Sequence, residues 1–417
     1  MKKYLILLIG LLSIYNQSVS QNIDYARGVI DTLASPEFFG RGYVNSGDKI
    51  AADYIVKQFE KSGVKPFEPG YLQPFEMCIN TFPGEIKLVA NGRELIPGTD
   101  FVVFPDAAPT NAVFKTMWLN GESLNTPQKI KKFNAARLGN VALIIDTGFK
   151  DLKNEKLNQA AALITITDKN VSWHVSRAQQ QSRQIKISLK RPSLPEKTRK
   201  IYLKIDAALQ KNYKTNNVVG YLPGRVSSDT FLVVGGHYDH LGMMGNKTFF
   251  PGANDNASGT AIVLDLARHF SDTANRPRYS VAFVLFAAEE AGLLGSEYFT
   301  THPPVPLKNI KFMVNLDMVS TGSEGIKVVN GSVLKEEFEK LKSINNHHNY
   351  LKTISERGEA ANSDHYFFYK NGVKSFFIYS LGDEYKEYHT VTDAAAGLPL
   401  TKYNEIFKLV KEFIYSF

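Results

Sequence analysis

The stretch FVLFAAEEAGLLGSEYF, residues 283–299, runs from apolar side chains directly into two adjacent glutamates, Glu289 and Glu290. The stretch itself contains no lysine or arginine. Carboxylates at the end of a buried strand are costly to bury unless a partner compensates their charge. The stretch therefore predicts a strand that ends at a site where groups distant in sequence neutralise the two glutamates.

Apolar runs of the same kind lie on both sides of this stretch. They are FLVVGG (231–236), KFMVNL (311–316) and SFFIYS (375–380), and the apolar start of the stretch itself belongs to the run VAFVLFA (281–287). Helix-type segments alternate with them, one from Ser258 to Phe270 and one that ends the chain at Phe417. Strands of buried type that alternate with helices predict an α/β domain with a largely parallel sheet.

A different pattern separates the first part of the chain from these runs. Short β-like runs with lysine-rich connections follow one another: VALIID (141–146), ALITIT (162–167) and IKISL (185–189). We therefore predict a small β-rich inserted domain over residues 85–211. The α/β domain is then discontinuous and comprises residues 21–84 and 212–417.

The N-terminus has the pattern of a secretory signal peptide. Lys2 and Lys3 precede the apolar segment YLILLIGLLSIY, and small residues at 18–20 follow it. We expect residues 1–20 to be removed and the mature protein to be exported, either to a periplasm or out of the cell. No other stretch approaches the ~20 apolar residues of a membrane span, so no integral membrane segment is expected after cleavage.

Composition narrows the functional classes. The chain has 417 residues, 43% of them hydrophobic, and a net charge of +8, and these values are typical of a globular protein. The positive charges are spread along the chain without interleaved aromatic residues, so nucleic-acid binding is not expected. The single cysteine, Cys78, cannot form an internal disulfide. A G-x-S-x-G motif is also missing, which argues against a serine hydrolase of that type.

Residues that can ligate metals follow nearly every predicted strand. In open α/β sheets the functional site lies at the carboxyl ends of the strands. The residues found there are His237, Asp239, Asp255, Glu289, Glu290, Asp317, His389 and Asp393. One such carboxylate is often only a helix cap, but the whole series together predicts a metal site that compensates the two glutamates.

Histidines mixed with carboxylates suit zinc, and several carboxylates favour two ions with a bridging ligand. Residues two apart in extended backbone face the same way, so Asp239 can orient His237. Adjacent Glu289 and Glu290 face opposite ways. One of them can therefore ligate a metal while the other acts as a base.

Five blocks of the sequence carry a resemblance to a known family. They are GGHYDH (235–240), GANDNASG (252–259), FAAEEAGLLGS (286–296), NLDM (315–318) and YHTVTD (388–393). In this order they resemble the di-zinc aminopeptidases of the aminopeptidase Y and bacterial leucyl aminopeptidase type, which are related to the transferrin-receptor-like zinc exopeptidases. The resemblance implies a three-layer α/β/α domain with a mostly parallel mixed sheet. It also implies that the inserted domain is similar to a protease-associated domain.

The resemblance also implies roles for individual residues. One zinc ion would be held by His237, Asp255 and Asp317, and the other by Asp255, Glu290 and His389. Glu289 would be the general base and Asp239 the partner of the zinc-bound histidine. A cis peptide bond is implied between Asp255 and Asn256.

The implied activity is that of a metal-dependent exopeptidase on peptide substrates, with an aminopeptidase favoured. A glutaminyl cyclase-like zinc acyltransferase, a carboxypeptidase of the same fold and a receptor-type module without catalysis are the alternatives. Side-chain preference and oligomeric state stay open.

Several polar residues near the motifs have a structural interpretation. Since two histidines already meet the usual count, His240 is expected outside the ligand set. His174 is expected to be solvated, as are His302, His347 and His348. Asp364 is expected either beside the site or as a helix cap.

Overall fold

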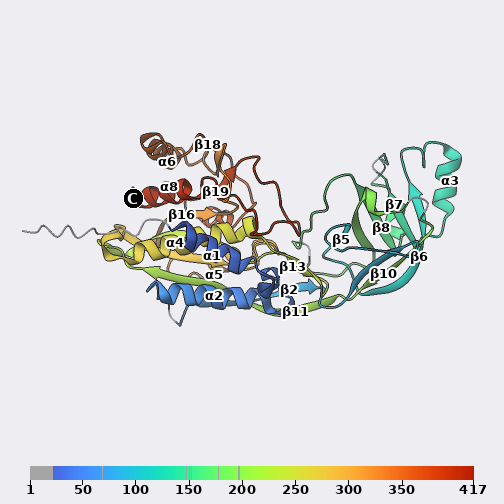
Figure 1. Cartoon of the computed structure of the whole chain (residues 1–417), viewed down its shortest axis with the longest axis horizontal. Helices are drawn as coiled ribbons and strands as arrows, with labels where there is room; N and C mark the ends of the chain where they lie inside the picture. The colour runs from blue at the N-terminus through green and yellow to red at the C-terminus, as the bar shows by residue number, and fades with distance from the viewer. Residues whose placement is uncertain are drawn as a thin grey trace, which may run out of the picture.

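The computed structural model of the chain describes residues 22–417, apart from residues 68, 147, 150, 152, 177, 196 and 197. The expected signal peptide at residues 1–20 therefore lies outside the described residues. Figure 1 shows two units along the long axis: a sheet covered by helices, which holds both the first and the last helix, and a second sheet at the other end.

The larger sheet contains nine strands within the described part of the chain. Its order is β1-β11-β15-β12-β16-β19-β17-β18, and β2 also pairs with β11. The four central strands β15, β12, β16 and β19 run parallel, whereas β11 and β17 join them antiparallel. The strands are β1 (Lys65–Pro66), β2 (Leu72–Thr81), β11 (Ala208–Leu222), β12 (Ser227–His237), β15 (Tyr279–Phe286), β16 (Ile310–Leu316), β17 (Gly325–Val329), β18 (Ile354–Arg357) and β19 (Ser375–Leu381).

Helices cover both faces of this sheet, which confirms the three-layer α/β/α arrangement. Alternate side chains of a strand point to opposite faces. In β15, Phe283 and Leu285 join the larger core beneath α1 (Ile23–Leu33), α2 (Gly47–Lys61), α4 (Gly259–Ser271) and α8 (Tyr403–Tyr415). Val284 and Phe286 join the opposite core, which includes Phe299 of α5 (Leu294–Thr301) and Phe368 of α7 (His365–Lys370). The apolar run in the sequence is therefore a strand that is buried on both faces.

The second sheet lies in the chain between β2 and β11. The two strands pair antiparallel from Leu72 with Val218 to Thr81 with Ala208, so the segment between them leaves and returns at one place. Its order is β4-β3-β10-β6-β7-β8-β9-β5. The elements are β3 (Ile86–Ala90), β4 (Arg93–Leu95), β5 (Phe101–Val103), β6 (Thr110–Leu119), α3 (Pro127–Ala135), β7 (Val141–Ile145), β8 (Ala162–Thr167), β9 (Ile185–Lys190) and β10 (Lys200–Ile205).

The two units share a hydrophobic contact. Met244 of β13 (Gly242–Met244) and Phe250 of β14 (Thr248–Phe250) belong to the core of the second sheet, although both follow β12 in the chain. The hairpin β13–β14 thus joins the second sheet to the region that follows β12, beside the carboxyl ends of the central strands.

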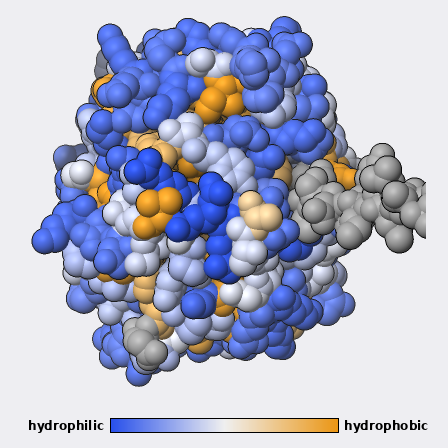
Figure 2. All heavy atoms as spheres, turned by 90° about the vertical axis from the view of Figure 1, so that its left-hand side faces the viewer, coloured by the Kyte–Doolittle hydropathy of each residue, from blue (hydrophilic) through white to orange (hydrophobic). Residues whose placement is uncertain are grey.

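The remaining helix, α6 (Lys335–His348), lies beside α8 at the end of the molecule away from the second sheet (Figure 1). The face seen from that end is mostly hydrophilic, with hydrophobic residues in small separate groups (Figure 2). Within the described residues, no helix combines the length and the apolar character needed to cross a lipid bilayer.

Candidate metal centre

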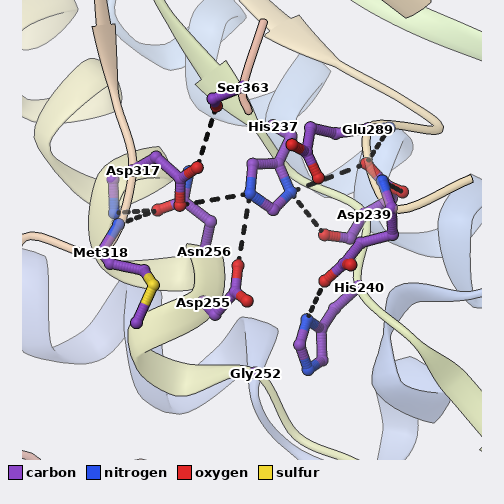
Figure 3. Close-up of polar contacts among 12 residues, drawn as sticks. His237, Asp239, His240, Gly252, Asp255, Asn256, Glu289, Asp317, Met318 and Ser363 are labelled. Atoms are coloured by element: carbon purple, nitrogen blue, oxygen red, sulfur yellow. Dashed lines mark hydrogen bonds and ion pairs between the residues drawn. The ribbon is translucent and has the colours of Figure 1, made fainter. Parts of the chain in front are cut away.

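The carboxyl ends of three parallel neighbours bring the predicted residues together. His237 is the last residue of β12, Glu289 lies three residues after β15, and Asp317 directly follows β16. Because β12 pairs with both β15 and β16, these ends meet at the same edge of the sheet. Asp255 enters from the irregular helical turn Ala253–Ser258 that precedes α4. Figure 3 shows these side chains around the ring of His237.

The Nε2 atom of His237 faces two carboxylates. It lies 3.3 Å from Oδ1 of Asp255 and 3.3 Å from Oδ1 of Asp317. The second oxygen of Asp317 accepts a hydrogen bond of 2.9 Å from the hydroxyl of Ser363. The orientation of Asp317 is therefore held from behind while its other oxygen points toward the histidine.

A second group of the same kind forms on the other side of Asp255. The Nε2 atom of His389 lies 3.0 Å from Oδ2 of Asp255 and 3.2 Å from Oε2 of Glu290. His389 comes from the loop between β19 and α8. The two oxygens of Asp255 thus face two different histidine–carboxylate groups, which is the arrangement that a bridging ligand requires.

Burial of these charged side chains away from water costs free energy unless their charges are neutralised. His237, Asp255, Glu290, Asp317 and His389 are all buried. Desolvation alone would lower the pKa of His237, but the nearby carboxylates of Glu289 and Asp317 raise it well above its ordinary value. Desolvation would likewise lower the pKa of His389, and Glu290 and Asp255 raise it instead. The cluster therefore creates a strong negative field that favours positive charge.

Asp239 contacts His237 through its backbone carbonyl as well as through the expected carboxylate. The backbone carbonyl of Asp239 lies 3.1 Å from Nδ1 of His237, whereas its carboxylate is 3.8 Å away. The carboxylate also accepts the backbone amides of Glu289 at 3.1 Å and Glu290 at 3.4 Å. These two amides, which follow β15 by three and four residues, hold the carboxylate within ion-pair distance of His237. Burial raises the pKa of Asp239 to about 7.

The two adjacent glutamates face different surroundings. Glu289 is only half-buried and lines a cavity of about 170 Å³ together with His237 and His389. Glu290 is buried and its carboxylate contacts His389 and His240. The two neighbouring carboxylates therefore point to different places: Glu289 faces the cavity and Glu290 is directed into the cluster.

His240 lies inside the cluster, although the sequence pattern placed it outside. Its Nδ1 atom is 2.9 Å from Oε1 of Glu290, and the side chain is fully buried. Ligand-type atoms of His240, Asp255 and Glu290 all lie within 4.8 Å of one another, as do those of His237, Glu289 and Asp317. The motif GGHYDH contains the signal for this position, because its second histidine follows the end of β12 by only three residues.

The loop that carries Asp255 is held from two sides. The carboxylate of Asp393 accepts the backbone amides of Asn254 at 2.9 Å and Asp255 at 3.1 Å, so Asp393 supports the loop rather than pointing into the cluster. The guanidinium of Arg41 donates to backbone carbonyls on both sides of the site, including those of Tyr238 and Gly252. The peptide bond between Asp255 and Asn256 is cis, as the resemblance implied.

One residue from the second sheet also reaches the cluster. The Nδ1 atom of His174 lies 3.0 Å from Nδ1 of His389. The expectation that His174 is only solvated was therefore incomplete, because its exposed ring also contacts a cluster residue 215 positions away. Asp364 stands at the N-cap position of α7, but its buried side chain makes no capping hydrogen bond, and burial raises its pKa to about 7.

The donor set of this cluster fits a divalent cation. Among the described residues, histidines are the only side chains at ion-pair distance from Asp255, Asp317 and Glu290. Imidazole nitrogens mixed with carboxylate oxygens are the ligands that zinc prefers. A buried excess of carboxylates without lysine or arginine partners is stable only when a cation or protons neutralise it.

Comparison of the fold with solved structures gives a similar arrangement over nearly the whole chain. A zinc aminopeptidase from Bacillus subtilis superimposes with a TM-score of 0.73, at 21% sequence identity, and the match covers 95% of this chain and 96% of that one. The likeness therefore includes the second sheet as well as the larger one. At this identity it shows a shared fold.

Comparison of sequences gives shorter but more similar matches. A probable zinc metalloprotease of Pyricularia oryzae is 39% identical over 118 residues, which are 27% of this chain and 23% of that protein. A probable leucine aminopeptidase of Arthroderma otae is 31% identical over 215 residues, 50% of this chain and 59% of that protein. The chain thus spans less than two thirds of the length of these curated relatives.

The model of peptidase family M28 matches residues 217–414. This range contains all five clustered residues and the central parallel strands. The segment from residue 217 to residue 414 therefore belongs to peptidase family M28.

Proposed function

We propose that this protein is a zinc-dependent aminopeptidase that removes N-terminal residues from peptides. The observation that carries the proposal is the position of Asp255, whose two oxygens face one histidine–carboxylate group each. The family of residues 217–414 and the names of the relatives, a zinc metalloprotease and a leucine aminopeptidase, support it.

Two zinc ions fit this site in the proposal. His237, Asp255 and Asp317 would hold one, and Asp255, Glu290 and His389 the other. When bound, zinc supplies Lewis-acid chemistry: it lowers the pKa of water and polarises a carbonyl group. His240, 2.9 Å from Glu290, holds that carboxylate in place.

Glu289 is the general base in this proposal. Its carboxyl group lines the cavity, so it can take a proton from the attacking water and deliver it to the leaving amine. Burial, together with the neighbouring charge of Glu290, raises the pKa of Glu289 well above its ordinary value. A carboxylate with a raised pKa binds a proton more readily, which suits a group that must take one up during the reaction.

The cavity supports cleavage at a chain end. Its volume of about 170 Å³ is below the roughly 300–1,000 Å³ of typical ligand pockets, so it suits one terminal residue better than a chain that passes through. Apolar and aromatic side chains also line the cavity; they are Met318, Phe377, Tyr379 and Tyr388. We therefore propose a preference for apolar N-terminal residues.

The test is mass spectrometry of a mixed peptide pool incubated with the zinc-loaded protein and, in parallel, with Glu289→Gln. Stepwise loss of N-terminal residues that is missing in the variant supports the proposal. Loss of ammonia only from peptides that begin with glutamine would indicate a cyclase. Trimming from the C-terminus would indicate a carboxypeptidase, and either result would overturn the aminopeptidase.

We further propose that the protein acts after export, in a periplasm or outside the cell. The support for this is the pattern of residues 1–20 alone. Fractionation of cells that express the full chain, with N-terminal sequencing of the product, tests it: an uncleaved chain in the cytoplasm would overturn it.

A further inference from the structure

The connection between β8 and β9 crosses from the second sheet to the candidate metal centre. In the sequence VSWHV, residues 171–175, every second side chain is buried: Val171, Trp173 and Val175. Residues in extended backbone alternate between two sides, so Ser172 and His174 face away from that core. The alternation therefore presents His174 toward the larger sheet.

Trp173 fixes this segment to the second sheet. Its indole nitrogen donates a 2.7 Å hydrogen bond to the carbonyl of Val103 in β5, and its ring lies 4.9 Å from that of Phe250. A buried tryptophan with its N–H satisfied is a rigid anchor. The residue that follows it, His174, consequently has little freedom to move.

The same segment is tied to both loops of the metal centre. The amide of Trp173 donates a 2.9 Å bond to the carbonyl of His389. Further along, the side chain of Gln179 donates to the carbonyl of Ala291, the residue after Glu290. The segment therefore spans the distance between the loop that carries His389 and the loop that carries the two glutamates.

Metal binding through Nε2 of His389 would set the tautomers of the two imidazoles that are in contact. Nε2 of His389 faces Asp255 and Glu290, so in a ring that binds metal through Nε2 the proton lies on Nδ1. That N–H points at Nδ1 of His174, 3.0 Å away, which then accepts the bond. In that arrangement the proton of His174 is on Nε2, 3.3 Å from the hydroxyl of Ser172.

We propose that His174 is a positioning residue: it accepts a hydrogen bond from Nδ1 of His389 and so orients this histidine toward the metal held with Asp255 and Glu290. The proposal rests on the proposed zinc function. A metal-binding histidine almost always donates its other N–H to a carboxylate, a carbonyl or water. His237 follows that rule through the carbonyl of Asp239. For His389 the acceptor comes from the inserted sheet, which thereby becomes part of the metal centre.

The experiment is calorimetric titration of the metal-free full-length protein with zinc. Three variants are compared with the wild type: His174→Ala, His174→Asn and, as a matched control, His347→Ala on α6, which replaces an exposed histidine at the other end of the molecule. Loss of an outer hydrogen-bond partner typically weakens metal binding roughly 10- to 100-fold. We expect a loss of this size in His174→Ala for one of the two ions only. His174→Asn, whose side-chain oxygen can accept the same bond, should recover most of the affinity.

The outcomes separate this proposal from the proposed function. If His174→Ala binds both ions as tightly as the wild type and the His347→Ala control, the positioning role is wrong while the zinc function stands. Equal losses in His174→Ala and His174→Asn would also overturn the hydrogen-bond role, because the acceptor would then not matter. A wild type that binds no zinc at all would overturn the proposed function, and the positioning role with it.

Discussion

Replacement of Arg41 by methionine is expected to destabilise the protein and disrupt the candidate metal centre together. The side chain of Arg41 is fully buried. Its guanidinium donates to the carbonyls of Tyr238 at 2.7 Å, Leu33 at 2.9 Å and Pro251 at 2.6 Å. It also donates to Gly252 at 2.7 Å and to Asp255 at 3.3 Å. One side chain therefore connects α1 with the loops that follow β12 and β14.

The expected loss of folding free energy in Arg41→Met follows from the backbone carbonyls that lose their hydrogen-bond donor. The carbonyl of Gly252 also accepts from the amide of Ala257, and the bond to Asp255 is long, so these two contribute little. Each of the other three buried carbonyls costs about 1–3 kcal/mol without its donor. The total of about 3–9 kcal/mol is comparable with the whole stability of many proteins, which is about 5–15 kcal/mol.

The assay is urea unfolding at equilibrium, followed in parallel by zinc titration of the folded protein. Arg41→Lys keeps the charge but cannot reach all the carbonyls, since an ammonium lacks the planar fork of the guanidinium, so an intermediate loss is expected. Arg93→Met, at an exposed position of β4, is the matched control and should change stability by less than about 0.5 kcal/mol. If Arg41→Met were also within about 1 kcal/mol of the wild type, the argument from the three carbonyls that lose their donor would be refuted.

Three other changes test separate parts of the molecule. Ser363→Ala removes the hydroxyl that donates to Asp317 and should weaken zinc binding roughly 10-fold, measured by competition with a chromogenic chelator; unchanged affinity would contradict the supporting role. Removal of metal with a chelator should lower the unfolding temperature and excess zinc should restore it, since a ligand at 100 times its Kd stabilises the folded state by about 2.7 kcal/mol; identical melting curves would argue against a zinc site. Glu85→Gln tests the pH dependence: hydrogen bonds from Lys204 and Lys87 lower the pKa of Glu85 from 4.5 to about 2, so its contribution is present above about pH 4.5 and is lost as the pH falls toward 2. The difference in urea midpoint between wild type and this variant should therefore shrink below pH 4.5, and a difference that grows instead would contradict the assignment.

Local patterns in the sequence determined the four central strands of the larger sheet. The run from Val281 to Phe286 is apolar at every position because β15 is buried on both faces, and this is visible without any knowledge of its neighbours. The same reasoning predicted β12, β16 and β19. Since parallel strands end at one edge, it also brought His237, Glu289 and Asp317 together.

Tertiary structure decided what each side chain of the site does. The spacing of His237 and Asp239 predicted a contact between their side chains, and the carboxylate does lie 3.8 Å from Nδ1 of His237. The closer contact, at 3.1 Å, is with the carbonyl of Asp239, and the carboxylate also accepts the amides of Glu289 and Glu290. His240 was assigned by counting histidines, yet its position beside Glu290 depends on the path of the chain after β12.

For the second sheet, the sequence alone could predict local burial but not the contacts with the metal centre. The alternation in residues 171–175 predicts which side chains face the core of that sheet, so the local direction of His174 could be read from it. Its contact with His389, 215 positions away, depends on how the two sheets pack against each other, through the hairpin β13–β14 and the hydrogen bonds of residues 173 and 179. The periodicity of apolar residues in the sequence indicates which side chains are buried, because burial repeats with the period of the strand or helix. Which group then meets it depends on long-range packing, and no local pattern encodes that.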